Sequence, residues 1–160
     1  MANVVITGSS KGIGRGLAEQ FVRRGHNVVV SARNAEEVAK AAASLNAIGP
    51  GRAIGQACDV SHKSEVQTLW ARAAQEYGRV DIWINNAGRA TARFLVHEVP
   101  EGIVHSLVDG NLKGTVFGAQ VAIEGFRAQG GGALYNMLGG TFEGTRLTPR
   151  MGVYSTTKAG

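Results

Sequence analysis

Hydrophobic residues along the chain follow two alternating patterns. Short runs such as Val4-Val5-Ile6, Val28-Val29-Val30 and Ile82-Trp83-Ile84 are continuously apolar, which is typical of parallel strands buried on both faces. The stretches between these runs repeat apolar residues at helical spacing. One of them places Val66, Leu69, Trp70, Ala73, Ala74 and Tyr77 on a single face, which predicts an amphipathic helix.

The alternation predicts a fold of repeated strand–helix units. The predicted strands cover residues 3–7, 27–31, 53–58, 80–85 and 133–137. The predicted helices cover residues 12–24, 34–48, 62–77 and 101–129, and another begins near residue 150. Asn34 and Ser61 are the predicted N-caps of the second and third helices. Right-handed crossovers then give a Rossmann-like, doubly wound parallel sheet in three α/β/α layers, and residues 1–160 are expected to form one domain.

The composition is that of a soluble globular protein, with 44% hydrophobic and 18% charged residues. No apolar run of the sequence has the length of a membrane span, and the first residues lack the pattern of a signal peptide. The sole cysteine, Cys58, fits a reducing cytoplasm and is interpreted as a small buried apolar residue. The net charge is +5, but the basic residues are scattered, which favours a small anionic ligand over nucleic acid.

A glycine-rich segment from Thr7 to Gly14 joins the first strand to the first helix. Its glycines allow a tight turn and let backbone N–H groups approach a pyrophosphate at the helix N-terminus. The spacing is G-x-x-x-G-x-G and differs from the G-x-G-x-x-G dinucleotide fingerprint. A glycine-rich turn without a ligand is the alternative interpretation.

The end of the second strand carries information about the cofactor. It reads Ser31-Ala32-Arg33, and the first acidic residue after it is Glu36. In NAD-binding sheets an acidic residue near this position binds the ribose hydroxyls. Arg33 and Lys11 can instead converge on a 2′-phosphate, so the sequence favours NADP over NAD. The alternative is that Arg33 is a solvated loop residue.

Tyr154 and Lys158 are four residues apart near the end of the sequence, a spacing that puts both side chains on one helix face. A free phenol titrates near ~10, and a neighbouring positive charge lowers that pKa. The pair is therefore predicted to exchange a proton with a substrate carbonyl or alcohol. Such pairs also occur on solvated helix faces, so the spacing alone does not decide the function.

In this order and at these separations the motifs resemble the short-chain dehydrogenase/reductase family over essentially the whole chain. The motifs that carry the resemblance are Thr7-Gly8-x-x-x-Gly12-x-Gly14, Cys58-Asp59-Val60, Asn85-Asn86-Ala87-Gly88, Asn111 and Tyr154-x-x-x-Lys158.

The resemblance implies roles for individual residues. Tyr154 would protonate the carbonyl oxygen as hydride arrives from the nicotinamide, and Lys158 would hold the ribose hydroxyls and lower the tyrosine pKa. Asn111 would anchor a water that links Lys158 to solvent, unless it is a helix-interior amide bonded to a neighbouring carbonyl. With the reasoning above, the expected cofactor-binding residues are Gly8, Ser10, Lys11, Gly12, Ile13, Gly14, Arg33, Asp59, Val60, Asn86, Ala87, Gly88, Tyr154 and Lys158.

The serine that the family usually places after the fifth strand is absent. Its position is Gly139 when read outward from that strand and Thr141 when counted back from Tyr154. Thr141 is predicted to take the catalytic role, because a threonine hydroxyl offers the same donor and acceptor, and Thr145 is the next candidate. If Gly139 holds the position, the substrate oxygen loses a hydrogen-bond donor.

Residues 81–88, Asn136-Met137-x-Gly139 and Thr148-Pro149 are similar to the chlorophyll(ide) b reductase group. That group reduces a formyl substituent on a tetrapyrrole and tends to lack the serine. The expected function is NADPH-dependent reduction of an aldehyde or ketone, or the reverse oxidation of an alcohol, in the cytoplasm.

Two alternatives remain, a non-catalytic dinucleotide-binding protein and an inactive fragment of a longer reductase. The family continues beyond the tyrosine helix into further strands and oligomerisation helices. The sequence is therefore expected to be a fragment or an incomplete record, and the full-length protein a homo-oligomer.

Overall fold

The computed structural model describes residues 1–90, 92–139 and 149–159 of the chain. The strands are β1 (Asn3–Ile6), β2 (Asn27–Ala32), β3 (Ala53–Ala57), β4 (Ile82–Asn85) and β5 (Ala133–Asn136). The helices are α1 (Gly12–Arg23), α2 (Ala35–Leu45), α3 (Lys63–Tyr77), α4 (Glu101–Leu107), α5 (Gly114–Gln129) and α6 (Gly152–Ala159). A 3₁₀ turn, η1 (Val96–Glu98), and a π-helical turn, η2 (Val108–Lys113), complete the described elements.

The five strands form one parallel sheet with the order β3-β2-β1-β4-β5. The predicted strand at residues 53–58 is confirmed, since β3 pairs in register with β2 from Val28↔Ala53 to Ala32↔Ala57. The strand order reverses at β1, which lies between β2 and β4. In open parallel sheets, ligands bind outside the carboxyl ends of the strands at such a reversal.

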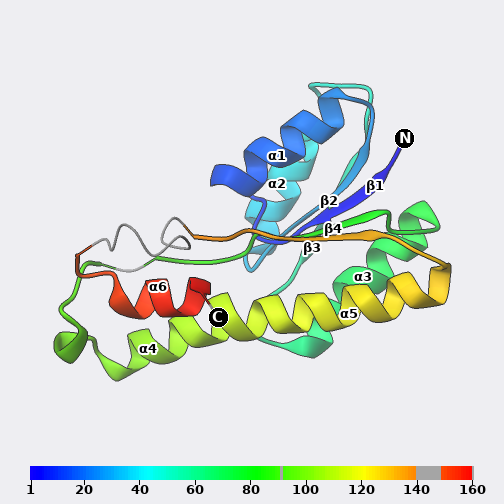
Figure 1. The fold of residues 1–160 in the computed structure, drawn as a ribbon. Helices are drawn as coiled ribbons and strands as arrows, with labels where there is room; N and C mark the ends of the chain where they lie inside the picture. Colours follow the sequence, from blue (N-terminus) through cyan, green and yellow to red (C-terminus); the bar gives the residue numbers. More distant parts are fainter. Residues whose placement is uncertain (91, 140–148, 160) are drawn as a thin grey trace.

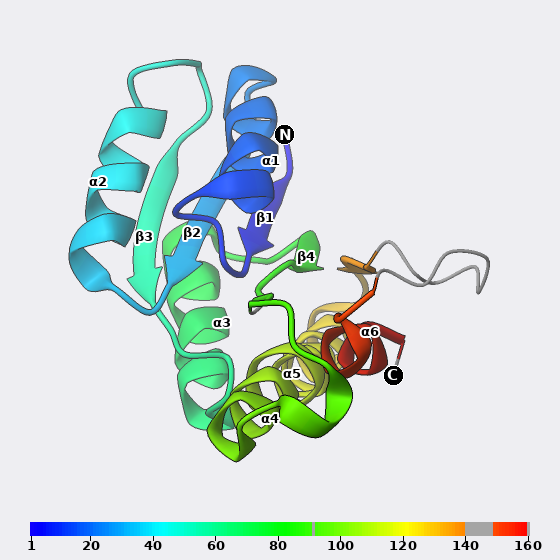
Figure 2. The same ribbon diagram turned by 90° about the vertical axis from the view of Figure 1, so that its left-hand side faces the viewer.

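Helices cover both faces of the sheet, as the alternating pattern predicts. α1 and α2 lie on one side, and α3, α4, α5 and α6 lie on the other (Figures 1 and 2). This three-layer arrangement confirms the predicted Rossmann-like α/β fold.

The continuous apolar runs in β1 and β2 supply both halves of the core. Val5 and Val29 pack toward α3 and α5 in one buried cluster. Val4, Val28 and their neighbours two residues on pack toward α1 and α2 in the other. Successive strand residues point to opposite faces, so a strand covered on both sides needs apolar residues at every position.

The predicted caps differ in outcome. Asn34 caps α2, and its side chain accepts a hydrogen bond from the backbone N–H of Glu37 at 3.0 Å. The prediction that Ser61 caps the third helix is wrong, because α3 begins at Lys63 with His62 as its N-cap. The Ser61 hydroxyl and backbone N–H both donate to Oδ1 of Asp59, at 2.7 and 3.0 Å. Asp59 thereby holds the serine in a turn before the helix.

The single long helix predicted at 101–129 is interrupted. α4 and α5 are joined by the π-helical turn η2, and Asn111 lies within this turn. π turns inside helices occur frequently at functional sites. Here the wider turn brings a buried amide to the side of the cleft, where Asn111 is only 2% exposed.

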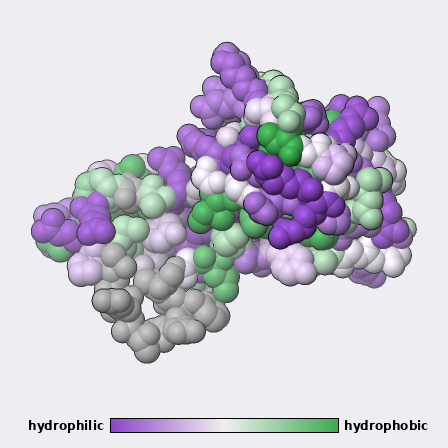
Figure 3. Space-filling model, turned by 90° about the horizontal axis from the view of Figure 1, so that it is seen from above, coloured by the Kyte–Doolittle hydropathy of each residue, from purple (hydrophilic) through white to green (hydrophobic). Residues whose placement is uncertain are grey.

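The view from above looks onto the side that carries α1 and α2, where hydrophilic and hydrophobic residues are interspersed (Figure 3). Among the described residues, no helix combines the length and the apolar character that crossing a bilayer requires.

Candidate active site

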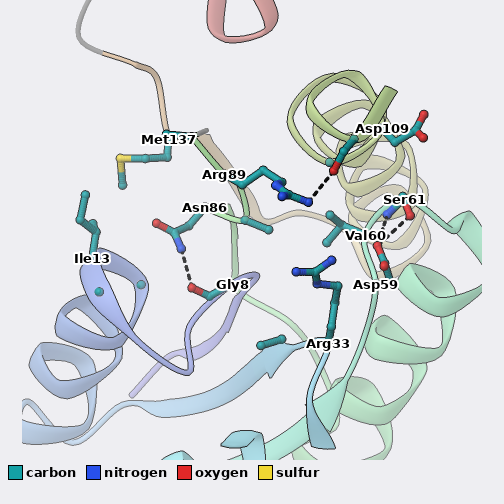
Figure 4. A pocket seen from close by; sticks show the side chains of 18 of the residues that line it. Gly8, Ile13, Arg33, Asp59, Val60, Ser61, Asn86, Arg89, Asp109 and Met137 are labelled. Carbon is teal, nitrogen blue, oxygen red and sulfur yellow. Dashed lines mark hydrogen bonds between the residues drawn. The ribbon is translucent and has the colours of Figure 1, made fainter. Parts of the chain in front are cut away.

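A cleft of about 730 Å³ lies at the carboxyl ends of the strands, where the sheet order reverses. Its volume falls in the range of small-molecule and cofactor sites. All of the predicted cofactor-binding residues line it: Gly8, Ser10, Lys11, Gly12, Ile13, Gly14, Arg33, Asp59, Val60, Asn86, Ala87, Gly88, Tyr154 and Lys158. Asn111 is not among the lining residues, and Thr141 lies outside the described residues. Figure 4 shows the glycine turn on one side of the cleft and Asp59, Val60 and Ser61 on the other.

The glycine turn packs directly against the segment that follows β4. Gly8 has φ +64°, and a Cβ built there would lie 2.7 Å from Cα of Ala87. Gly14 faces the side-chain amide of Asn86 with no space for a methyl group. The glycines therefore serve a close approach between two backbone segments as well as the turn itself.

Hydrogen bonds of Asn86 stabilise this contact between the glycine turn and the segment after β4. Its side-chain amide donates to the carbonyl oxygens of Thr7 at 2.8 Å and of Gly8 at 2.9 Å. The Thr7 hydroxyl accepts from the backbone N–H groups of Asn86 and Ala87 at 3.1 and 3.0 Å. These four bonds fix the carboxyl ends of β1 and β4 relative to each other, although the two motifs are far apart in the sequence.

The first turn of α1 provides a site for an anion. Its N-cap, Lys11, makes no side-chain cap bond, and the turn contains no acidic residue. The backbone N–H groups at this end are therefore available to a phosphate, which the helix dipole also favours. Ile13 follows in the same turn and is 68% exposed, an unusual position for a large apolar side chain beside a cleft.

Opposite the turn lies a charged end of the cleft. Arg33, which follows β2, points into the cleft (Figure 4). Partial burial by itself raises the pKa of Asp59, but the two hydrogen bonds from Ser61 and the charges of Arg33 and His62 outweigh it and lower the pKa below its usual value. Asp59 is therefore ionised at neutral pH. Val60 beside it is buried and also lines the cleft.

α6 brings Tyr154 and Lys158 together on the wall of the same cleft. Gly139, three residues after the end of β5, lies against both side chains. A Cβ built on Gly139 would be 2.9 Å from Cβ and Cγ of Lys158 and 3.5 Å from the Tyr154 hydroxyl oxygen. Gly139, one of the two candidates for the serine position, thus lies beside both predicted catalytic side chains, and the choice between the candidates stays a prediction. Thr141 and Thr145 lie outside the described residues.

Lys158 is half-buried, and desolvation lowers the pKa of its ammonium below the usual value. Its Nζ donates to the carbonyl oxygen of Met137 at 3.1 Å, which leaves two of its three N–H donors for other partners. The segment Asn86–Gly88 after β4 lies directly beside it, since a Cβ on Gly88 would be 3.1 Å from this Nζ.

Asn111 uses its whole side chain inside the protein. Oδ1 accepts from the backbone N–H of Arg89 at 2.8 Å, and Nδ2 donates to the Arg89 carbonyl oxygen and to Oγ1 of Thr157, both at 3.0 Å. The amide thus joins the loop after β4 to α6. This geometry fits the predicted alternative of an internal amide. Because the side chain is fully used, a water could be anchored only by the backbone carbonyl of Asn111. That carbonyl also accepts a hydrogen bond from the Thr115 hydroxyl at 2.7 Å.

Arg89 is a cleft residue that the sequence analysis missed. Its guanidinium reaches across to α4, where Nη1 donates to Oγ of Ser106 at 2.5 Å, and it points into the cleft near Arg33 (Figure 4). Within the described ranges neither arginine has a carboxylate within 4.0 Å. The signal was the position of Arg89 immediately after Asn86-Ala87-Gly88.

These features fit a dinucleotide phosphate. The cleft combines a glycine cradle without side chains, uncapped helical N–H groups and two guanidinium groups that lack ion-pair partners among the residues described. A parallel sheet with such a cleft at its strand reversal defines a dinucleotide-binding protein of the Rossmann type.

Comparison with known proteins narrows the class to a family. A family model described as short chain dehydrogenase matches residues 2–160. The chain is 38% identical over 160 residues to the chlorophyll(ide) b reductase NOL, chloroplastic, of Oryza sativa subsp. japonica, covering 98% of this chain and 46% of that protein. It is 31% identical over 155 residues to a 3beta-hydroxysteroid dehydrogenase of Mediterraneibacter gnavus, covering 97% of this chain and 55% of that protein.

A solved structure agrees with this match. The alcohol dehydrogenase from the archaeon Thermococcus sibiricus, complexed with 5-hydroxy-NADP, is similar with a TM-score of 0.86 at 28% identity, covering 99% of this chain and 66% of that one. The chain therefore belongs to the short-chain dehydrogenase family, whose members are NAD(P)-dependent oxidoreductases. It spans between 34% and 46% of the length of the chlorophyll(ide) b reductases that it matches.

Proposed function

We propose that this protein is an NADPH-dependent reductase that converts an aldehyde or ketone to the alcohol, with Tyr154 as the proton donor. One observation carries the proposal. The Tyr154 hydroxyl and the alkyl stem of Lys158 both lie against Gly139 on the wall of the cleft that contains the glycine turn. A proton donor and a phosphate cradle thus open into one space.

NADPH held in this cleft would supply the hydride for the carbonyl carbon and would be released as NADP⁺. As the carbonyl π bond breaks, Tyr154 donates its phenolic proton to the carbonyl oxygen, which completes the alcohol. Lys158 offers its two remaining N–H donors to the ribose hydroxyls, while the Met137 carbonyl holds its third. Asn111 then acts through its backbone carbonyl, which would anchor the water that leads the replacement proton toward Lys158.

The preference for NADPH rests on charge at the adenosine end. Arg33 and Lys11 both line the cleft, and the position after β2 lacks the carboxylate that binds an unmodified ribose. A guanidinium fork and an ammonium both suit a 2′-phosphate.

For the substrate we favour a formyl-bearing tetrapyrrole. Four relatives are named chlorophyll(ide) b reductase or probable chlorophyll(ide) b reductase, and Gly139, which carries no hydroxyl, lies beside the Tyr154 hydroxyl. A steroid-type ketone is the competing class, since another relative is named 3beta-hydroxysteroid dehydrogenase. A cytoplasmic location and a homo-oligomeric state stay predictions, and the names of the chlorophyll(ide) b reductases include the word chloroplastic.

The decisive variant is Tyr154→Phe, which removes only the hydroxyl. With the full-length protein, NADPH oxidation is measured against chlorophyllide b, a 3-ketosteroid and a panel of simple aldehydes. We expect turnover to fall at least about 100-fold, while the dissociation constant of NADPH stays within about threefold. The matched control is Tyr135→Phe, because Tyr135 is 57% exposed on β5. Full activity of Tyr154→Phe would refute the mechanism.

The absence of a side chain at Gly139 favours one other candidate, a dinucleotide-binding protein without efficient chemistry. That function predicts tight NADPH binding by the full-length protein and no NADPH oxidation with any member of the panel. An inactive fragment would instead show weak binding and no cooperative thermal unfolding.

A further inference from the structure

Thr157 lies on α6 between the proposed proton donor and the proposed ribose-binding lysine. It is 5% exposed, and its hydroxyl donates to the backbone carbonyl oxygen of Tyr154 at 2.8 Å. The Thr157 hydroxyl oxygen also accepts a hydrogen bond from Nδ2 of Asn111 at 3.0 Å. A hydroxyl has a single proton, and a carbonyl oxygen can only accept. The direction of both bonds is therefore fixed, from the amide to the hydroxyl to the helix backbone.

Asn111 links this pair of hydrogen bonds to the segment that follows β4. Its Oδ1 and one Nδ2 proton bind the N–H and C=O of Arg89, and its other Nδ2 proton binds Thr157. Both Nδ2 protons of Asn111 are used, so the Asn111 amide can donate to Thr157 only in the orientation that it has here. Arg89 directly follows Gly88, which lies against Nζ of Lys158.

We propose that Thr157 is a positioning residue, whose buried hydroxyl fixes α6, and with it Tyr154 and Lys158, relative to the cofactor segment Asn86–Gly88. The inference rests on the proposed function. It assigns to one side chain the task of fixing the position of the proton donor Tyr154 relative to the dinucleotide. Reaction rates depend steeply on the relative position of the reacting groups, and a displacement of about 1 Å can lower the rate about 100-fold.

The neighbouring residue provides the control. Thr156 is on the same helix and exposed, and its hydroxyl makes an ordinary bond to the carbonyl oxygen of Gly152 at 3.0 Å. Thr156→Val and Thr157→Val therefore make the same chemical change, with only the second one removing the connection to Asn111. Thr157→Ser keeps the hydroxyl and removes the methyl group.

The experiment measures kcat and KM for the aldehyde or ketone that the full-length wild-type protein reduces, the dissociation constant of NADPH by its fluorescence, and the melting temperature. We expect Thr157→Val to lower kcat by between about tenfold and about 100-fold, with KM and NADPH affinity within about threefold. Thr157→Ser should recover most of kcat, and Thr156→Val should stay within about twofold of the wild type. If Thr157→Val does not fold, Thr157→Ala gives the same comparison without the larger side chain.

Two results would overturn the inference. One is a folded Thr157→Val or Thr157→Ala variant with wild-type kcat and only a lower melting temperature, which describes a structural hydroxyl. The other is a failure of Thr157→Ser to recover activity, which would assign the effect to packing of the methyl group. The outcome is separable from that of the proposed function, because an active Tyr154→Phe variant refutes the mechanism whatever Thr157 does.

Discussion

Two glycines of the phosphate turn have nearly the same backbone conformation and opposite surroundings. Gly8 has φ +64° and Gly12 has φ +61°. A Cβ on Gly8 would lie 2.7 Å from Cα of Ala87, whereas a Cβ on Gly12 would meet nothing within 4 Å. Substituting alanine at each position therefore separates the cost of a left-handed backbone from the cost of crowding.

We expect Gly12→Ala to lower the free energy of unfolding by about 1–2 kcal/mol, the usual cost of a left-handed conformation for a residue with a Cβ. Gly8→Ala carries this same cost. It also forces the segment at Ala87 to move by several tenths of an ångström, since ordinary Cβ contacts begin at 3.4 Å. Overpacking of this kind costs about 1–3 kcal/mol, so the total for Gly8→Ala is about 2–5 kcal/mol.

The assay is urea unfolding followed by tryptophan fluorescence, because Trp83 on β4 is fully buried and its ring lies against that of Trp70 on α3. NADPH binding of each folded variant is measured in parallel. Gly8→Ala should also weaken NADPH binding, because Ala87 lies in the cleft. Equal destabilisation by the two substitutions, or a larger effect at Gly12, would refute the crowding argument.

Lys158→Met removes a half-buried ammonium whose pKa is lowered by desolvation, so the melting temperature should stay constant or rise while NADPH affinity falls; a clear loss of thermal stability would contradict this. Arg33→Leu should weaken NADPH binding by about 10–100-fold, the value of a charged hydrogen bond, and NADH binding by less than about threefold. Equal losses for the two dinucleotides would place Arg33 away from the 2′-phosphate. Burial raises the pKa of Cys58 from 9.0 to about 12 and that of Tyr77 from 10.0 to about 12. The unfolded chain then ionises first, so the stabilisation is complete below pH 9 and decreases between pH 9 and pH 12. Urea midpoints across that interval check the sign, and a rising midpoint would be inconsistent with it.

The strands were predictable because their residues face identical environments on both sides. Val28, Val29 and Val30 are all 0% exposed, and an uninterrupted apolar run is the simplest signature of that state. The cap at Ser61 was not predictable from local sequence alone. Serine suits an N-cap, but the carboxylate of Asp59 two residues earlier takes both of its donors.

The candidate site was predictable to the level of its motifs. Every cofactor-binding residue named from the sequence lines the cleft, while the roles of these residues stay predictions. The serine position was ambiguous, because counting from β5 and counting from Tyr154 give different residues. Gly139 contacts the two α6 side chains, while Thr141 lies outside the described residues, so the choice stays a prediction.

The α/β order, the glycine turn and the spacing of Tyr154 and Lys158 follow from local sequence, because each of these depends on neighbours within a few residues. Tertiary structure alone decided which distant groups meet: the Asn86 amide on the turn after β1, the π turn that carries Asn111, and the hydroxyl of Thr157 between that amide and α6. Such contacts join elements separated by dozens of residues. Local propensity holds no information about them until the sheet and helices have packed.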